Sequence, residues 1–322
     1  MSEDIGRAPP AMAVGQDEGL PRPPDPEAPL VSVIIPSWGR PDELNRCVSS
    51  VLKSSYRPLE IVVVDSPRNA AYSSDGIDSA ETGLRVYKSP ARLYTSAARN
   101  RGIALSKGQI LFFVDNDNIL PVESISRLAA VLVGDSSIGF VGPVAYYKYD
   151  PSRVWSAGAY KSKFFRRHTP KRFAPDGPKL YDVDVISNAF MTRRDVLDRI
   201  GPFDAINFTI QEEDAELQIR ARRGGFRTVI LTNAATYHDI DPSPTAHFTS
   251  EGLRAGFRGR FWEEKKHDRR NVLGFGLFAL FLIPYYFLLA SLAFLETRSD
   301  PPLVVFSAAI RGIAEGLFRE PA

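Results

Sequence analysis

Cysteine is nearly absent from this sequence, which has one, Cys47, among 322 residues. A single cysteine cannot form an intramolecular disulfide, which suits a reducing cytoplasm. The chain also has no large excess of charge of either sign, since it contains 40 Lys and Arg and 38 Asp and Glu residues. This balance gives no sign of a polyanionic partner, and we expect no nucleic-acid binding. The N-terminus lacks the basic stretch and apolar run of a signal peptide, so the folded part of the chain is expected inside the cell.

Apolar residues are scarce at the N-terminal end. Residues 1–29 hold seven prolines among Asp, Glu and small residues. Such a segment cannot bury enough apolar surface to order itself. We expect a disordered, proline-rich leader, and a tail without specific function is the simplest interpretation. The whole chain has 44% hydrophobic and 24% charged residues, enough for a sizeable core elsewhere.

From Leu30 onward, apolar runs alternate with amphipathic stretches. The run Val31–Pro36 is short, β-branched and closed by a proline, as is typical of a buried strand. Similar runs predict strands at 61–64 and 110–114, and helical spacing predicts helices after Pro41, around 98–105 and around 125–132. Shorter strands are expected near 140–145, 185–191 and 226–231, with a helix over 214–223. The sequence predicts an α/β, Rossmann-like domain over 30–245 with a mostly parallel central sheet.

A long stretch near the C-terminus, residues 271–295, has no charged residue. A helix of about 24 residues covers about 36 Å, more than the roughly 30 Å of a hydrocarbon core. We predict a transmembrane or re-entrant helix over 271–296, interrupted by Gly274, Gly276 and Pro284. A buried helix of a soluble domain is the alternative.

The connector that precedes this stretch, residues 246–270, is basic. Only Arg298 directly follows the stretch, whereas four cations come before it: Lys265, Lys266, Arg269 and Arg270. By the positive-inside rule we expect the domain 30–245 on the cytoplasmic face of the membrane, anchored by the C-terminal segment.

The last segment, residues 301–320, predicts an amphipathic helix. One helical stripe carries Val305, Ala309, Ile313 and Leu317. A helix lying in the membrane interface fits this pattern, and a helix docked on the domain 30–245 is the alternative.

Two carboxylates follow the predicted strand 110–114 directly, in the motif Asp115-Asn116-Asp117. Ligands of open α/β sheets bind beyond the carboxyl ends of the strands. Such a pair suits Mg²⁺ or Mn²⁺, which bridge carboxylates to substrate phosphates. A solvated acidic turn is the alternative.

A second acidic group, Glu212-Glu213-Asp214, precedes a predicted helix. A carboxylate there could take the proton of an acceptor hydroxyl, although acidic residues also favour helix N-termini through the helix dipole. His238, one of four histidines, is either a structural residue or a metal ligand at the end of a strand.

These features, in this order, resemble the family 2 glycosyltransferases with the GT-A fold over about 30–238. The resemblance is carried by six segments of this sequence: 31–44, Glu60-Ile-Val-Val-Val-Asp65, Ala98-Arg-Asn-Arg-Gly102, Asp115-Asn-Asp117, 190–204 and Glu213-Asp-Ala-Glu-Leu217. Two stretches differ from the family pattern. Asp65-Ser66-Pro67-Arg68 stands in place of Asp-Asp-Gly-Ser, and Trp38-Gly39 in place of Tyr-Asn.

The resemblance implies a role for each matching residue. Asp214 is expected to be the catalytic base, with Glu213 as its nearest rival. Metal ligation is expected from Asp117, Asp115 and His238, with Mg²⁺ or Mn²⁺ as the cofactor. Binding of the nucleotide-sugar donor is expected from Pro36, Trp38, Arg40, Asp65, Arg99, Asn100 and Asp115.

The expected function is inverting transfer of a sugar to a membrane-associated acceptor, a lipid-linked glycan. The basic loop 161–172 includes Phe164 and Phe165; it is either a solvated loop or a contact for lipid phosphates. Two other functions fit the same motifs. These are a nucleotidyltransferase, and a non-catalytic membrane module that binds nucleotide sugar.

Overall fold

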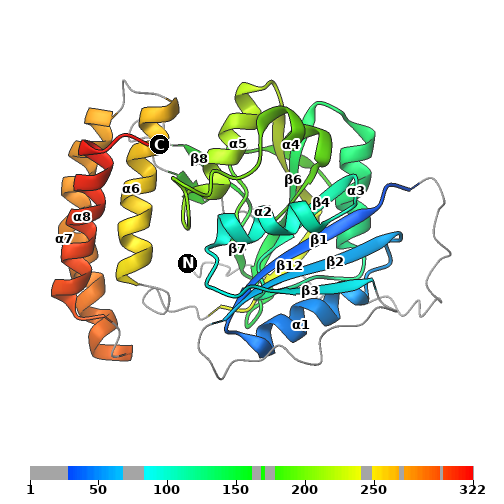
Figure 1. Ribbon diagram of the computed structural model, residues 1–322, viewed down its shortest axis with the longest axis horizontal. Coiled ribbons are helices and arrows are strands. Elements are labelled where there is room, and N and C mark those ends of the chain that lie inside the picture. Colours follow the sequence, from blue (N-terminus) through cyan, green and yellow to red (C-terminus); the bar gives the residue numbers. More distant parts are fainter. Residues whose placement is uncertain are drawn as a thin grey trace, which may run out of the picture.

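The computed structural model describes residues 28–67, 83–161, 168–170, 178–240, 249–267, 272–297 and 300–321. Nearly all of the predicted leader and most of the basic loop 161–172 lie outside the described residues. The described chain forms an α/β part built on a central sheet, and beside it a column of three C-terminal helices (Figure 1).

The central sheet is mixed. Its main strand order is β10-β12-β6-β11-β4-β1-β2-β3. The first-half strands are parallel to one another: β1(Val31–Trp38), β2(Leu59–Ser66), β3(Leu84–Lys88) and β4(Ile110–Val114). The second half supplies β6(Ile138–Tyr147), β10(Leu180–Asp182), β11(Ala189–Arg193) and β12(Arg227–His238). Two short strands join the same sheet, β5(Asn118–Ile119) beside β12 and β7(Val154–Ser156) beside β6, whereas β8(Ala159–Lys161) and β9(His168–Pro170) form a separate two-stranded sheet.

The direction of β11 corrects the prediction of a mostly parallel sheet. This strand runs antiparallel to both of its neighbours, β4 and β6. Phe190 of β11 lies opposite Phe113 of β4. An apolar run reads the same in either chain direction, so its pattern reports burial but not orientation.

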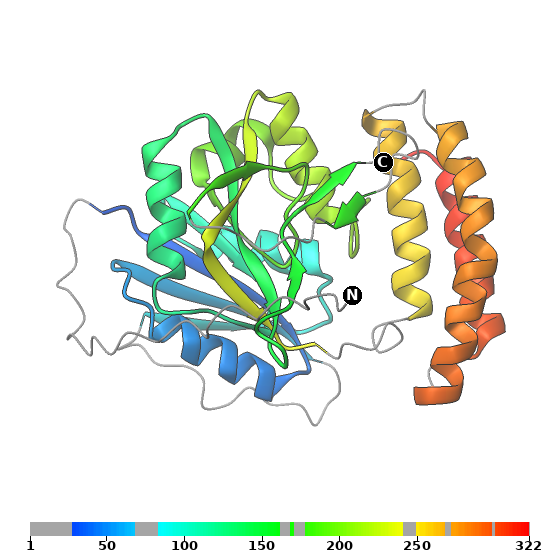
Figure 2. The ribbon, with the colours of Figure 1, turned by 180° about the vertical axis from the view of Figure 1, so that it is seen from behind.

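Helices cover both faces of the sheet (Figures 1 and 2). They are α1(Pro41–Leu52), α2(Thr95–Leu105), α3(Ser124–Gly134), α4(Arg194–Ile200) and α5(Glu213–Arg223). Successive residues of a strand point to opposite faces, so Val33 and Ile35 pack in the core cluster with α1 and α3, whereas Ile34 packs in the cluster with α4 and α5. Both layers hold the carboxyl ends of β1 and β4 in place.

The C-terminal unit consists of α6(Ser250–His267), α7(Val272–Thr297) and α8(Pro302–Phe318). Helix α6 lies between the α/β part and the pair α7 and α8 (Figure 1). The sequence pattern of the connector 246–270 had not indicated a helix of this length.

The apolar stripe of α8 faces inward. Val305, Ala309 and Ile313 are buried, and the latter two pack with Phe261 of α6 and Phe275 of α7. This corrects the expectation that the stripe lies in a membrane interface, because the other two helices already cover it.

The segment predicted to be a membrane helix, 271–296, forms α7, with Pro284 inside it. Among the described residues, no helix combines the length and apolar character needed to cross a membrane, so that prediction is not supported. Two of the cations used to predict the orientation make contacts within the protein. Lys265 donates to the carbonyl oxygen of Leu317 at 2.9 Å, and Lys266 lies 2.9 Å from Asp204.

Candidate active site

Acidic residues from two distant segments meet beyond the end of β4. Asp115 and Asp117 follow this strand, and Glu213 and Asp214 begin α5. The side chain that joins them is Arg99 of α2, which is 1% exposed. Its guanidinium lies 2.9 Å from Asp115 and 3.6 Å from Glu213, and it donates a short hydrogen bond to Asp214. The structure therefore brings together carboxylates that stand about a hundred residues apart in the sequence.

A buried polar network beneath the acidic motif fixes its position. Asn118 and Asn188 exchange amide hydrogen bonds, and Thr236 donates to Asn118 at 2.9 Å. The backbone NH of Asp115 donates to the carbonyl of Asn188 at 3.0 Å. Asn188 also has a positive φ of 78°, a conformation that is uncommon outside glycine and often occurs at functional sites. Strands β4, β11 and β12 thus hold the motif in one place.

Asp117 is held by two cationic or polar partners. Its carboxylate lies 3.2 Å from Nη1 of Arg40 and 3.2 Å from Nε2 of His238. The ring of Trp155 packs edge-on against His238, with centroids 4.4 Å apart. The predicted metal ligands Asp117 and His238 are therefore neighbours, and Asp115 belongs to the same motif.

The cluster raises the pKa of most of its acids. Burial raises the pKa of Asp214 to about 6, with the charge of Asp115 adding and Arg99 opposing. Burial and then the charge of Asp214 raise the pKa of Glu213 to about 8. Burial also raises the pKa of Asp115. The pKa of Asp117 is lowered, because the hydrogen bond and charge of His238 and the charge of Arg40 outweigh its burial. At neutral pH, Asp214 is more ionised than Glu213.

The cluster suits a divalent cation that takes further ligands from a substrate. Even with Glu213 protonated, three carboxylates face two guanidinium groups, and this excess negative charge would repel a diphosphate unless a cation lay between them. Within the described residues, no three His, Cys, Asp or Glu side chains are already arranged to hold a metal ion. Mg²⁺ is commonly bound by one or two carboxylates plus substrate phosphates, so Asp117 and its neighbours fit that kind of site.

The other predicted donor residues occupy different surroundings. Trp38, at the end of β1, is 39% exposed, with the guanidinium of Arg92 3.9 Å above its ring. Pro36 is part of β1 and half-buried. Asp65 is buried at the end of β2. Exposed aromatic surface at a strand end could stack on a base.

Asn100 does not point into the cluster. Its amide nitrogen donates to the carbonyl of Phe203 at 2.8 Å, and its amide oxygen accepts from the NH of Phe203 at 3.0 Å. The nitrogen and the oxygen of this side-chain amide both bind the backbone of Phe203, so we assign Asn100 a structural role that ties α2 to the turn before α5.

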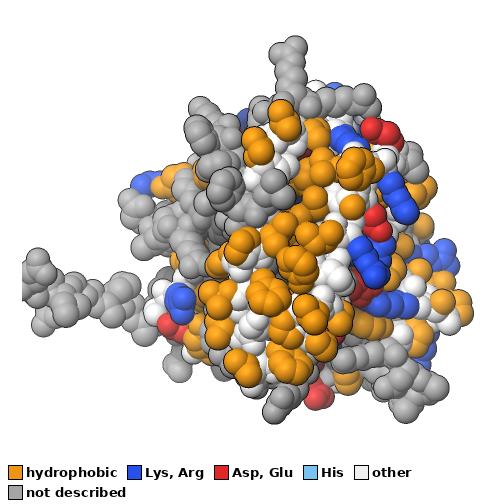
Figure 3. Space-filling model, turned by 90° about the vertical axis from the view of Figure 1, so that its left-hand side faces the viewer, with side chains coloured by type: hydrophobic (Ala, Val, Ile, Leu, Met, Phe, Trp, Pro, Cys, Tyr) orange, Lys and Arg blue, Asp and Glu red, His pale blue; other side chains and the backbone are white. Residues whose placement is uncertain are grey.

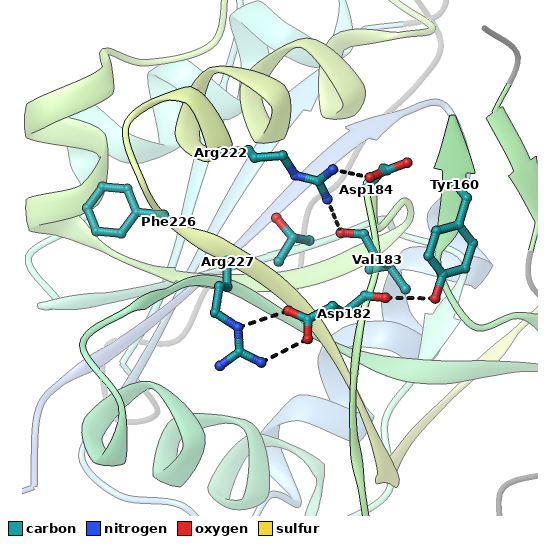
Figure 4. Close-up of a pocket in the computed structure, with 8 residues that line it drawn as sticks. Tyr160, Asp182, Val183, Asp184, Arg222, Phe226 and Arg227 are labelled. Carbon is teal, nitrogen blue, oxygen red and sulfur yellow. Dashed lines mark hydrogen bonds and ion pairs between the residues drawn. The ribbon is translucent and has the colours of Figure 1, made fainter. Parts of the chain in front are cut away.

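A separate hollow of about 340 Å³ lies along β10 and the start of β12 (Figure 4). None of its lining residues belongs to the acidic cluster. Its charges pair with one another: Arg227 with Asp182 at 2.9 Å, and Arg222 with Asp184. We assign no ligand to this hollow.

Sequence reasoning missed the residues that support the cluster. Asn118, Asn188 and Thr236 are isolated polar positions whose partners are distant in the chain, and no local pattern marks them. A signal was present for Asn118 alone, which directly follows the acidic motif.

Comparison with known proteins gives the family. The model of glycosyl transferase family 2 matches residues 32–201, more than half of the chain. The protein therefore belongs to glycosyl transferase family 2.

Individual relatives are distant. Glycosyltransferase AglE of Haloferax volcanii is 27% identical over 266 residues, which cover 78% of this chain and 80% of AglE. Glycosyltransferase GlyG of Streptococcus pneumoniae serotype 4 is 30% identical over 125 residues. That match spans 38% of this chain and 41% of GlyG, less than half the length of the relative.

Solved structures show the same GT-A-like fold. Mannosyltransferase PcManGT from Pyrobaculum calidifontis, in complex with GDP-Man and Mn²⁺, has a TM-score of 0.55 at 17% identity, over 92% of this chain and 89% of its own. GalNAc-T7 with UDP, GalNAc and Mn²⁺ has a TM-score of 0.62 at 18% identity, over 75% of this chain and 50% of its own.

Proposed function

We propose that this protein is an inverting glycosyltransferase that moves a sugar from a nucleotide diphosphate-sugar to a hydroxyl acceptor. The observation that carries the proposal is the position of Arg99, which contacts Asp115 beyond β4 and Asp214 at the start of α5. The guanidinium of Arg99 thus connects the acidic motif at the end of β4 with Asp214. The pKa of the Asp214 carboxyl is about 6.

Asp214 is the proposed base. The acceptor oxygen forms a bond to the anomeric carbon, the bond from that carbon to the diphosphate oxygen breaks, and the proton of the hydroxyl passes to Asp214. A carboxylate with a pKa of about 6 is mostly ionised at neutral pH, yet is a stronger base than an ordinary aspartate. Glu213 has a pKa of about 8 and is mostly protonated there, which favours Asp214.

The cofactor in this proposal is Mg²⁺ or Mn²⁺, held by Asp117 with Asp115 and His238. When bound, it would neutralise the charge that develops on the departing diphosphate. Arg40 fixes one oxygen of Asp117, which leaves the orientation of that carboxylate defined before any donor binds.

The test compares two neighbouring acids. Asp214→Asn is expected to lower turnover at least about a hundredfold, as loss of a general base does, while nucleotide binding with Mn²⁺ stays within about twofold. Glu213→Gln is the matched control and keeps measurable turnover. Undiminished turnover in Asp214→Asn, or a larger loss in Glu213→Gln, would remove Asp214 from the role of base.

Donor class is decided by a binding panel. The two structural neighbours were solved with UDP and with GDP-Man, so UDP-, GDP- and dTDP-sugars with Mn²⁺ are the informative set. Turnover of a sugar phosphate with a nucleoside triphosphate, and of none of these donors, would instead identify a nucleotidyltransferase.

We further propose that the acceptor is membrane-associated and that α7 and α8 bind the surface of a lipid bilayer. Figure 3 shows a broad hydrophobic face over these helices, with Lys and Arg side chains along one edge. Exposed leucines recur on one side of α7 at helical spacing: Leu273, Leu277, Leu288, Leu292 and Leu295. Exposed apolar faces rimmed by cations mark membrane-contact sites. The lone cysteine suits the cytoplasmic side, where this proposal places the enzyme.

Vesicle flotation tests this surface. The protein is expected to float with vesicles that contain anionic lipid, and a variant with Leu273→Ser, Leu277→Ser and Leu288→Ser is expected to stay in the lower fraction. Val133→Ser is the control, because Val133 is 63% exposed on α3, far along the chain from this face. If the leucine variant floats like the parent, or if the face instead mediates self-association in the absence of lipid, the membrane proposal is wrong.

A further inference from the structure

The turn that precedes the proposed base has an unusual backbone. Gln211 and Glu212 both have positive φ angles, 60° and 61°, and Glu213 and Asp214 follow at once. Two consecutive residues other than glycine in the left-handed region are rare, and such a conformation persists only where surrounding contacts impose it. Some other element must therefore hold this turn.

Helix α6 packs directly on the turn. A Cβ atom at Gly259 would lie 3.3 Å from Cβ of Glu212 and 3.6 Å from the carbonyl oxygen of Gln211. One turn earlier on α6, a Cβ at Gly256 would lie 4.0 Å from Cβ of Gln211. Glycine at 259 thus lets the backbone of α6 come closer to the turn than a side chain would permit.

A buried charge cluster joins α6 to the same turn. Arg260 is 4% exposed, and its guanidinium lies 2.7 Å from Glu263, 3.2 Å from Glu264 and 3.8 Å from Glu212. Lys161 of β8 contacts Glu263 and lies 3.3 Å from Glu264. Buried charges hold their geometry because separating them leaves an uncompensated charge. Arg260 therefore joins this buried cluster to the side chain of Glu212 in the turn.

We infer that α6 is a clamp that positions the proposed base, with Gly259 and Arg260 as positioning residues. This inference rests on the proposed function, in which Asp214 accepts the proton. Arg99 holds the carboxylate of Asp214, and α6 packs on the backbone turn that directly precedes that residue. The C-terminal unit, which lies outside the matched family region 32–201, thereby contributes to catalysis without contacting the reacting atoms.

The experiment compares two identical substitutions on one helix. Gly259→Ala forces the 211–212 turn to shift by a few tenths of an ångström, whereas Gly256→Ala adds the same methyl group at an ordinary contact distance. Gly259→Ala is expected to lower kcat about tenfold or more, because small misplacements of a reacting group are costly. The KM for the donor is expected to stay unchanged. Gly256→Ala is expected to keep the parent kcat.

Amide hydrogen exchange supplies a measurement that does not need turnover. Exchange at the amides of 213–216 is expected to be faster in Gly259→Ala than in the parent or in Gly256→Ala. Arg260→Lys, which keeps the positive charge, is expected to retain a larger fraction of the parent kcat than Arg260→Met. Equal kcat and equal exchange in the two alanine variants would overturn the clamp. If the parent transfers sugar from no donor of the panel, the proposed function fails separately, and exchange at the turn still decides whether α6 holds it.

Discussion

Replacing Arg99 with methionine perturbs the whole acidic cluster at once. Arg99 is 1% exposed and contacts Asp115, Glu213 and Asp214, so its loss leaves three carboxylates without their shared cation. Removing one partner of a buried ion pair costs about 3–5 kcal/mol of folding stability. Loss of only about 1.4 kcal/mol of attraction would raise the pKa of Asp214 by about one unit, from about 6.

The sign of the pH dependence follows from the same charges. Arg99 stabilises the ionised acids, so its contribution is present when they are ionised and disappears as they take up protons at low pH. The stability deficit of Arg99→Met is therefore expected to be larger at pH 8 than at pH 5. In Arg99→Met, the pH at which kcat falls to half of its maximum on the acidic side is expected to rise by about one unit.

Urea unfolding at both pH values and a pH profile of kcat measure these effects. Arg101→Met is the matched control, because Arg101 lies on the same helix, is exposed and packs over the ring of Tyr87 at 4.3 Å. The reasoning would be refuted by an Arg99→Met deficit that is the same at pH 5 and pH 8, or no larger than that of the control.

Two further substitutions test the fold and the cluster. Burial, and then the charge of Asp214, raise the pKa of Glu213 from 4.5 to about 8, so the folded parent loses stability as the pH rises through this range. The free energy of unfolding of Glu213→Gln, relative to that of the parent, is therefore expected to increase by at least about 1 kcal/mol between pH 5 and pH 8. Calorimetry at the two pH values checks this, and a constant difference would contradict it. A Cβ at Gly102 would overlap the side chain of Ile34, so Gly102→Ala is expected to cost about 1–3 kcal/mol. Gly134→Ala, which meets no atom within 4 Å, is expected to be neutral or slightly stabilising in the same denaturation assay.

Local patterns in the sequence were sufficient for the elements that begin the fold. The predicted strand Val31–Pro36 lies within β1, and the predicted strand Ile110–Val114 is β4. Burial on both faces requires a continuous apolar run, and that requirement is visible in a single chain. The acidic motif was also recognisable, because it directly follows such a run.

Other features depended on partners that are distant in the chain. The stripe Val305, Ala309 and Ile313 was evident as a pattern, but only packing showed that α6 and α7 cover it. Asn100 matched a motif, yet in the structure the nitrogen and the oxygen of its side-chain amide both hydrogen-bond to the backbone of Phe203.

The sequence by itself determined which residues could be buried and which acids stand at a strand end, because periodicity and adjacency are local properties. Tertiary structure alone decided the direction of β11, the junction of Asp115 with Asp214 through Arg99, and the contact of α6 with the 211–212 turn. Each of these depends on which distant groups come within a few ångströms. No pattern along the chain encodes that proximity, since it results from the packing of the whole fold.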